Sequence, residues 1–198
     1  MEQSEFYNST DNNNLLERIL SGAPAAIEGD AKACNKYIDQ VIFVNKDIYA
    51  HYHIRIMVEC DKCSSLLDMM RHIIKSIHPM ALAIPNQEQK EEIEYAKEDI
   101  QEYYDDLSQI NNEISYHIKF LEYLRQLKDI QYCPLLVLLN FDAVKNYFYG
   151  RPDEFMKTRM FADVSSLIIC SLQPIKEIEI NSCGVSYLYN VFNTYKIK

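Results

Sequence analysis

The sequence predicts a mainly α fold: an antiparallel helical bundle with long heptad-patterned helices, followed by a small C-terminal α+β module. Two long segments carry apolar side chains at alternating spacings of three and four residues, the pattern of one helix face. The 198 residues include only four glycines, fewer than sandwiches or phosphate-binding loops require. A hydrophobic content of 48% supplies enough apolar side chains for a core.

The chain opens with a polar segment, and residues 1–13 predict a disordered N-terminus. Four apolar residues at helical spacing then predict a short helix: Leu15, Leu16, Ile19 and Leu20. This helix is expected to end at Ser21-Gly22, before Pro24. It opens a predicted helical bundle domain over residues 14–130.

The first long helical pattern runs over residues 32–77. Asn45-Lys46-Asp47 predicts a break in it, because Asn and Asp compete for backbone hydrogen bonds. From Tyr49 onward the apolar or small positions alternate in steps of mostly three and four: Tyr49, Tyr52, Ile56, Cys60, Cys63, Leu67, Met70, Ile74 and Ile77. A strand over residues 53–58, where Ile54, Ile56 and Val58 alternate, is the open alternative.

A loop bracketed by Pro79 and Pro85 is predicted next, and Asn86 with Gln89 resembles a helix capping box. The second long pattern then covers residues 93–124, with a weak point at Asn111-Asn112. Two long amphipathic segments joined by a short loop are expected to pack antiparallel.

The composition changes after Ile130, and residues 131–198 predict the small α+β module. The apolar run Leu135–Phe141 is either a buried strand or a buried helical turn, because periodicity does not separate the two. Pro152 is expected at the first position of a helix whose apolar face continues to Ser171. Alternation on both sides of residues 181–184 predicts a β-hairpin over 178–191.

The formal net charge of −9 argues against direct nucleic-acid binding, because phosphate affinity depends on clustered Lys and Arg. Between Glu88 and Asp106, nine acidic residues stand against two lysines, a local net of −7. A solvated helix face is the simplest explanation, and docking to a basic partner is the functional alternative. Six cysteines without a signal peptide, and no long apolar run, predict an intracellular protein that does not enter a membrane.

Cys60 and Cys63 form the sharpest candidate metal pair, with His51, His53, His72 and His78 nearby in sequence. A second close pair is missing, however, and both cysteines lie on the predicted apolar face, so core packing is the preferred interpretation. No nucleophile elbow, P-loop, dinucleotide-binding or HExxH pattern occurs. We therefore predict no catalytic, cofactor-binding or metal site, and no cofactor.

The apolar stripes are longer than one helical hairpin buries on a single seam. They are either core alone or core plus a surface for other protein subunits in a hetero-oligomer. The residues predicted for such an interface are Tyr103, Leu107, Ile110, Ile114, Leu121, Leu167 and Ile168.

Several segments taken in order resemble the GINS family, the small subunits that join the MCM helicase ring in DNA replication. They are Leu15-Leu16-Glu17-Arg18, Ala23–Glu28, Leu66–Ile77, Glu92–Glu98 and Asp163-Val164-Ser165-Ser166-Leu167-Ile168. The resemblance implies a helical domain first, a small β-rich domain last, and a nuclear, non-catalytic subunit of a heterotetramer.

Together these patterns predict a non-enzymatic assembly subunit of an intracellular multi-protein complex, the GINS part of the replicative helicase if the resemblance holds. The alternatives are an unrelated coiled-coil adaptor subunit and a small zinc-binding protein that uses Cys60 and Cys63.

Overall fold

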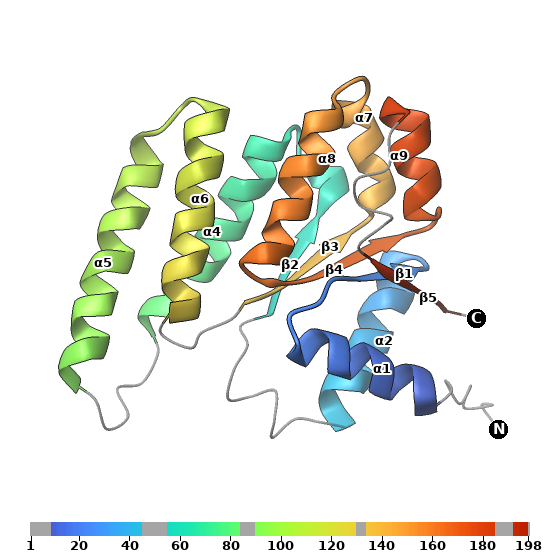
Figure 1. Cartoon of the computed structure of the whole chain (residues 1–198), viewed down its shortest axis with the longest axis horizontal. Coiled ribbons are helices and arrows are strands. Elements are labelled where there is room, and N and C mark those ends of the chain that lie inside the picture. Colours follow the sequence, from blue (N-terminus) through green and yellow to red (C-terminus); the bar gives the residue numbers. More distant parts are fainter. Residues whose placement is uncertain (1–8, 45–54, 84–89, 130–133, 185–191, 198) are drawn as a thin grey trace.

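A five-stranded parallel sheet forms the centre of the computed structural model, which describes residues 9–44, 55–83, 90–129, 134–184 and 192–197 (Figure 1). Its strand order is β2-β3-β4-β1-β5. The strands are β1 (Ala25–Glu28), β2 (Arg55–Glu59), β3 (Leu135–Leu139), β4 (Ser166–Ser171) and β5 (Asn193–Lys196). The sheet therefore takes strands from both sides of residue 130.

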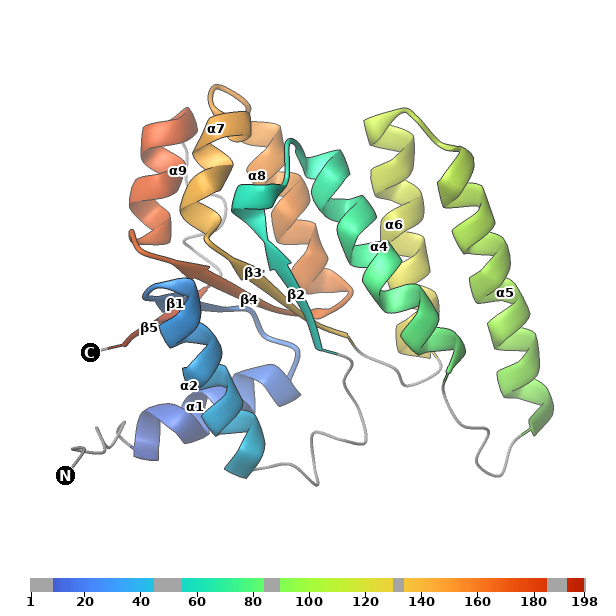
Figure 2. The same cartoon turned by 180° about the vertical axis from the view of Figure 1, so that it is seen from behind.

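Helices cover both faces of this sheet (Figures 1 and 2). One face carries α1 (Ser9–Leu20) and α2 (Ala31–Val44). The helices on the side of the opposite face are α4 (Leu66–Leu82), α5 (Lys90–Gln109), α6 (Glu113–Asp129), α7 (Lys145–Phe148), α8 (Pro152–Arg159) and α9 (Ile175–Cys183). Three short 3-10 helices, η1 (Cys60–Lys62), η2 (Phe141–Val144) and η3 (Met160–Asp163), lie in the connections.

The route of the chain explains why the helices lie on both faces. From β1 the chain crosses to the far strand β2 through α2, and it then returns through β3 and β4 to β5. Parallel crossovers keep one hand, so a reversal of direction along the sheet requires the connecting helices to change face. The result is a three-layer α/β architecture.

The central strands are buried on both faces, which is why they lack polar alternation. Every residue of β3 and of β4 is buried. Side chains alternate between two hydrophobic clusters: Leu136 and Leu138 pack with α4 and α6, whereas Leu135 and Val137 pack with α1 and α2. Edge strand β2 shows the half-buried pattern instead, with Ile56 and Val58 inward and Met57 and Glu59 exposed.

The α5–α6 hairpin extends beyond the β2 edge of the sheet, with α6 against α4 and α5 outermost (Figure 1). The predicted weak point at Asn111-Asn112 is confirmed, because α5 ends at Gln109 and α6 begins at Glu113. Asn112 caps α6: its side-chain oxygen accepts a hydrogen bond from the Ser115 backbone N–H at 3.0 Å. Other predictions confirmed are the helix end before Pro24 and the helix start at Pro152.

The predicted fold class, a mainly α bundle with a C-terminal α+β module, was wrong. The parallel sheet is the organising element, and the helices pack against it as separate pieces rather than as a continuous bundle. Within residues 32–77 the alternative was right: β2 is a strand, and the helical pattern had run across it. Residues 9–13, predicted to be disordered, belong to α1.

Three further local predictions were wrong. Residues 78–82 continue α4, with Pro79 inside the helix, and do not form a loop. The helical face predicted up to Ser171 ends at Arg159, and residues 166–171 form β4. The first strand of the predicted hairpin is instead helical, as α9.

The break predicted at residues 45–47, the capping box at 86–89 and the second hairpin strand at 185–191 lie outside the described residues. Among the helices that the structure describes, none has the length and apolar character needed to cross a membrane.

Candidate functional site

The carboxyl ends of the strands are the first place to look for a ligand site, because ligands of open α/β sheets bind there, beside the strand where the chain order reverses. In this sheet that strand is β1, which lies between β4 and β5. The loops at this edge include Gly29-Asp30 after β1, Asn140 after β3 and Leu172-Gln173 after β4.

The β1–α2 junction is short and closed by its own hydrogen bonds. Asp30 Oδ1 accepts a hydrogen bond from the Ala33 backbone N–H at 2.8 Å, which places a carboxylate on the first turn of α2. The Gly29 N–H donates to the Ser171 carbonyl oxygen at 2.9 Å, and the Cys34 thiol donates to the Gly29 carbonyl oxygen at 3.4 Å. A Cβ at Gly29 would lie 3.2 Å from Ile197, so the backbone is closely packed here.

A second carboxylate closes the loop after β4. Asp142, in η2, accepts hydrogen bonds from the backbone N–H groups of Leu172 and Gln173 at 2.7 and 2.8 Å. Nearby, the Asn140 amide donates to Asp61 at 2.8 Å. The polar groups of this edge thus bind one another.

A hollow of about 1060 Å³ lies at the other end of β1 and β5, against α1. It is lined by Asn14, Glu17, Arg18, Ser21, Ala23, Phe192, Asn193, Thr194 and Tyr195. The Arg18 guanidinium, its basic group, donates two hydrogen bonds to the Pro24 carbonyl oxygen at 2.7 and 3.1 Å. These bonds fasten α1 to the start of β1.

Cys60 and Cys63, the candidate metal pair of the sequence, have different neighbours in the structure. Cys60 lies in η1 with no exposed surface, and Cys63 lies in the turn that follows, towards α4. Burial, with the charges of Cys63 and Asp61, raises the pKa of Cys60 well above its ordinary value. Burial and the charge of Asp68 raise the pKa of Cys63 to about 11. Both cysteines thus belong to the same buried hydrophobic cluster, and Cys63 also faces α4.

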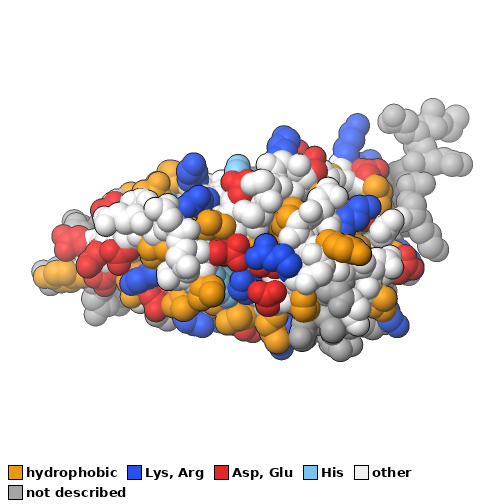
Figure 3. All heavy atoms as spheres, turned by 90° about the horizontal axis from the view of Figure 1, so that it is seen from above, with side chains coloured by type: hydrophobic (Ala, Val, Ile, Leu, Met, Phe, Trp, Pro, Cys, Tyr) orange, Lys and Arg blue, Asp and Glu red, His pale blue; other side chains and the backbone are white. Residues whose placement is uncertain are grey.

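An ion-pair network joins α6 to α8. Lys157 lies 2.9 Å from Glu113, 3.5 Å from Glu154 and 3.5 Å from Asp153, and Arg151 lies 2.8 Å from Glu154. Burial and the charge of Glu113 raise the pKa of Glu154, whereas Lys157 lowers the pKa of Glu113 against the opposing effect of burial. Seen from above, acidic and basic side chains lie beside one another in the middle of the molecule (Figure 3).

A buried histidine connects α4 to the α5–α6 hairpin. The His78 ring stacks on Tyr104 with 3.7 Å between ring centroids, and it hydrogen-bonds Tyr123 and Gln101. Burial lowers the pKa of His78, although the hydrogen bond to Gln101 acts against this. Both ring nitrogens of His78 thus have hydrogen-bond partners, and these contacts connect three helices.

The structure separates the residues predicted for a partner interface. Four of them lie in the core of this chain: Leu107, Leu121, Leu167 and Ile168. Tyr103 and Ile110 are partly buried against that core. Ile114, on α6, is 62% exposed, and Ile118, one turn further on, is 53% exposed. On α5, five carboxylates of the acidic segment are exposed: Glu98, Asp99, Glu102, Asp105 and Asp106.

The sequence reasoning missed Asp30, Asp142, Glu154 and Lys157. Asp30 had a local signal, because an Asp directly before a helical pattern is a common N-cap. Asp142 and Lys157 have partners in distant segments, as in the 44-residue separation between Glu113 and Lys157. Glu154 pairs with Arg151 and Lys157, each three residues away.

No protein-family model and no curated protein matches this sequence. Solved structures do match. The chain resembles the Aeropyrum pernix ORC2 protein in its ADP form (TM-score 0.55, 10% identity, 95% of this chain and 46% of that one). For the ADPNP-ADP complexes of ORC2 the TM-score is 0.58 at 10% identity, covering 96% of this chain and 46% of that one. For the A. pernix ORC1 protein in complex with DNA the TM-score is 0.50 at 10% identity, covering 94% and 44%.

This chain thus spans less than half the length of the chains it resembles, and at this identity the likeness shows the fold alone. That fold is an α/β architecture with a five-stranded parallel sheet between layers of helices. The GINS resemblance was therefore wrong, and so was the nuclear GINS subunit that it implied. The alternative, an unrelated coiled-coil adaptor, was wrong as well, because the fold is not a helical bundle. The exclusion of enzymes was also wrong, because it rested on a helical fold and the chain has the parallel α/β sheet of the structures it resembles.

Proposed function

We propose that this chain is an AAA+-fold subunit that binds other protein chains in an assembly of the replication-initiator type. The likeness of nearly the whole chain to the ORC2 structures carries the proposal. The formal net charge of −9 supports protein partners over direct contact with nucleic acid, because DNA binding requires clustered basic side chains. The described structure has its exposed acidic face on α5, which favours a partner with basic side chains.

The exposed side of α6 offers a place for such a partner. Ile114 and Ile118 are spaced four residues apart on one helix face, and both leave more than half of their surface exposed. Apolar side chains surrounded by charged ones are typical of the centre of a protein interface. Of the residues predicted for the interface, Ile114 is the one that the structure leaves open to a second chain.

Affinity purification of the tagged full chain from its native source tests this proposal. We expect the wild-type chain to retain proteins of the ORC type, and the double variant Ile114→Lys/Ile118→Lys to lose them. Both side chains are exposed, so the double variant should change the free energy of unfolding by no more than about 0.5 kcal/mol per site.

Leu172→Lys is the matched control, because Leu172 is 70% exposed but lies after β4, away from α6. This variant should retain the same partners as the wild type. Recovery of the chain alone, or recovery only with helicase-ring proteins, would count against the proposal. If Leu172→Lys lost the same partners, the partner-binding surface could not be assigned to α6.

An adenine nucleotide, the ligand named in the ORC2 structures, does not fit the residues at the carboxyl edge. Phosphates bind where a Gly-rich loop presents free N–H groups at a helix N-terminus. Here the corresponding junction holds one glycine, and the Asp30 carboxylate occupies the first turn of α2. The other three glycines, at 22, 150 and 184, lie elsewhere. A phosphate would therefore meet a like charge.

We expect saturating ADP with Mg²⁺ to leave the midpoint temperature of unfolding of the full chain unchanged. A ligand that binds the folded state at 100 times its Kd adds about 2.7 kcal/mol, which a thermal melt resolves. An ADP-dependent rise in this temperature would show that the junction opens to phosphate.

A further inference from the structure

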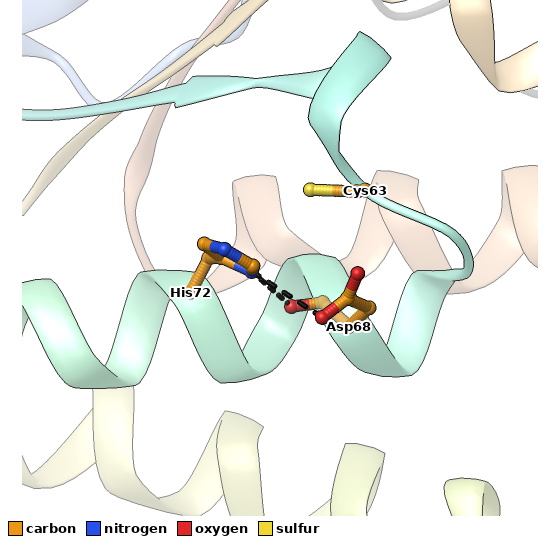
Figure 4. Close-up of side chains that lie close together, drawn as sticks. All are labelled: Cys63, Asp68 and His72. Atoms are coloured by element: carbon orange, nitrogen blue, oxygen red, sulfur yellow. Dashed lines mark hydrogen bonds and ion pairs between the residues drawn. The ribbon is translucent and has the colours of Figure 1, made fainter.

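Cys63, Asp68 and His72 gather three different metal-ligating groups in one place, outside the sites described above (Figure 4). Their ligand atoms all lie within 4.8 Å of one another. Cys63 comes from the turn after η1, whereas Asp68 and His72 are four residues apart and so share one face of α4. A turn and the helix that follows it thus bring a thiol, a carboxylate and an imidazole together.

The local structure holds two of these ligands in place. Ser65 is the N-cap of α4 and accepts a hydrogen bond from the Asp68 N–H at 3.1 Å. Asp68 Oδ2 in turn accepts hydrogen bonds from the Ser64 N–H at 2.9 Å and from its hydroxyl at 3.2 Å. Asp68 Oδ1 lies instead 3.4 Å from the His72 ring Nδ1, which also hydrogen-bonds the Asp68 backbone carbonyl oxygen at 2.9 Å (Figure 4). Helix capping therefore accounts for Oδ2 but leaves Oδ1 beside the imidazole.

The identity of the groups favours one class of cation. Zn²⁺ accepts sulfur, nitrogen and oxygen ligands together, whereas Mg²⁺ and Ca²⁺ take oxygen ligands. A tetrahedral zinc ion with bonds of about 2.0–2.3 Å holds its ligand atoms about 3.5 Å apart. Donors within 4.8 Å need shifts of about 1 Å, which the half-exposed His72 and partly exposed Asp68 side chains can supply. A thiolate and a carboxylate would balance both charges of the ion.

We propose that Cys63, Asp68 and His72 form a zinc site with three protein ligands and a fourth position open to water. Cys60 is not a ligand, because its side chain has no exposed surface and its sulfur is not among the ligand atoms that lie within 4.8 Å of one another. The site joins the end of β2 to the first two turns of α4. It is independent of the proposed function and of the acidic face on α5.

Titration of the reduced full chain with Co²⁺, a spectroscopic substitute for Zn²⁺, tests the site. We expect one Co²⁺ per chain, a sulfur-to-cobalt charge-transfer band, and displacement of the band by Zn²⁺. The variant Cys63→Ser should abolish this band. Asp68→Asn and His72→Gln should weaken binding by at least about tenfold, because each removes a direct ligand.

Two matched controls separate this site from its neighbours. Cys60→Ala removes the other thiol of the pair, and Asp61→Asn removes a nearby carboxylate outside the cluster. Both should bind Co²⁺ like the wild type. The proposal is overturned if the wild-type chain shows no charge-transfer band, if Cys63→Ser keeps it, or if Cys60→Ala loses it. His72→Gln changes an exposed side chain, so a fold defect does not obscure its result.

Discussion

Replacing Phe161 with alanine is expected to lower the free energy of unfolding by about 4 kcal/mol, the cost typical of deleting a fully buried aromatic side chain. Phe161 has no exposed surface, and its ring centroid lies 4.9 Å from that of Phe120 and 6.2 Å from that of His117. It lies in η3, directly before β4, and so attaches α6 to the body of the sheet. Little can move into the cavity, because both neighbouring rings belong to a helix fixed by its own packing. Chemical denaturation of the wild type and the variant measures the difference.

Met156→Ala is the matched control. Met156 lies on α8, five residues earlier, but is partly exposed, and the change should cost no more than about 0.5 kcal/mol. Equal losses in the two variants would mean that the packing around η3 is not as described.

The central sheet was missed because fully buried parallel strands carry no periodic signal. β3 reads as an unbroken apolar run, which fits a buried strand or a buried helical turn equally well. β4 lies in a stretch where a three–four spacing continued by chance from α8. Which strands pair, and in which order, depends on contacts between segments far apart in the chain.

Elements with local signals were predictable. The break between α5 and α6 follows from Asn111-Asn112, and the start of α8 follows from Pro152. The inward Ile56 and Val58 marked β2 as the strand alternative, but helical spacing on both sides of it obscured the boundary. Cys60 and Cys63 belonged to that apparent stripe, although they follow the strand.

Part of the candidate zinc site could be predicted from the sequence. Asp68 and His72 have the spacing that brings two side chains onto one helix face, and Cys63 was already a candidate ligand. The missing step was the capped turn at Ser65, which folds Cys63 back over α4. Sequence proximity paired Cys63 with Cys60 instead. Both thiols are buried, and the position of Cys63 beside Asp68 and His72 distinguishes the two.

Replacing Lys157 with methionine is expected to lower the free energy of unfolding by about 3 kcal/mol, because it leaves a buried carboxylate with too little compensating charge. The Glu154 side chain is 1% exposed, and it shares two cations with Glu113: Lys157, 2.9 Å from Glu113, and Arg151, 3.8 Å from Glu113. Arg151 remains 2.8 Å from Glu154, so the loss of unfolding free energy should lie at the lower end of the range known for broken buried ion pairs. Lys145→Met, on the exposed side of α7, is the control and should have little effect.

The loss in Lys157→Met should depend on pH and on Glu154. Burial already raises the pKa of Glu154 above its ordinary value of 4.5, and removal of Lys157 should raise it further. The folded variant then binds a proton more readily than the unfolded chain, so its deficit is full at neutral pH and shrinks as the pH falls towards 4.5. Adding Glu154→Gln to Lys157→Met should restore about 1 kcal/mol or more at neutral pH, because the uncompensated charge is gone. The loss of stability could instead be the same at every pH and unchanged in the double variant. Lys157 would then act by packing its alkyl chain between α6 and α8, and not by compensating the charges of Glu113 and Glu154.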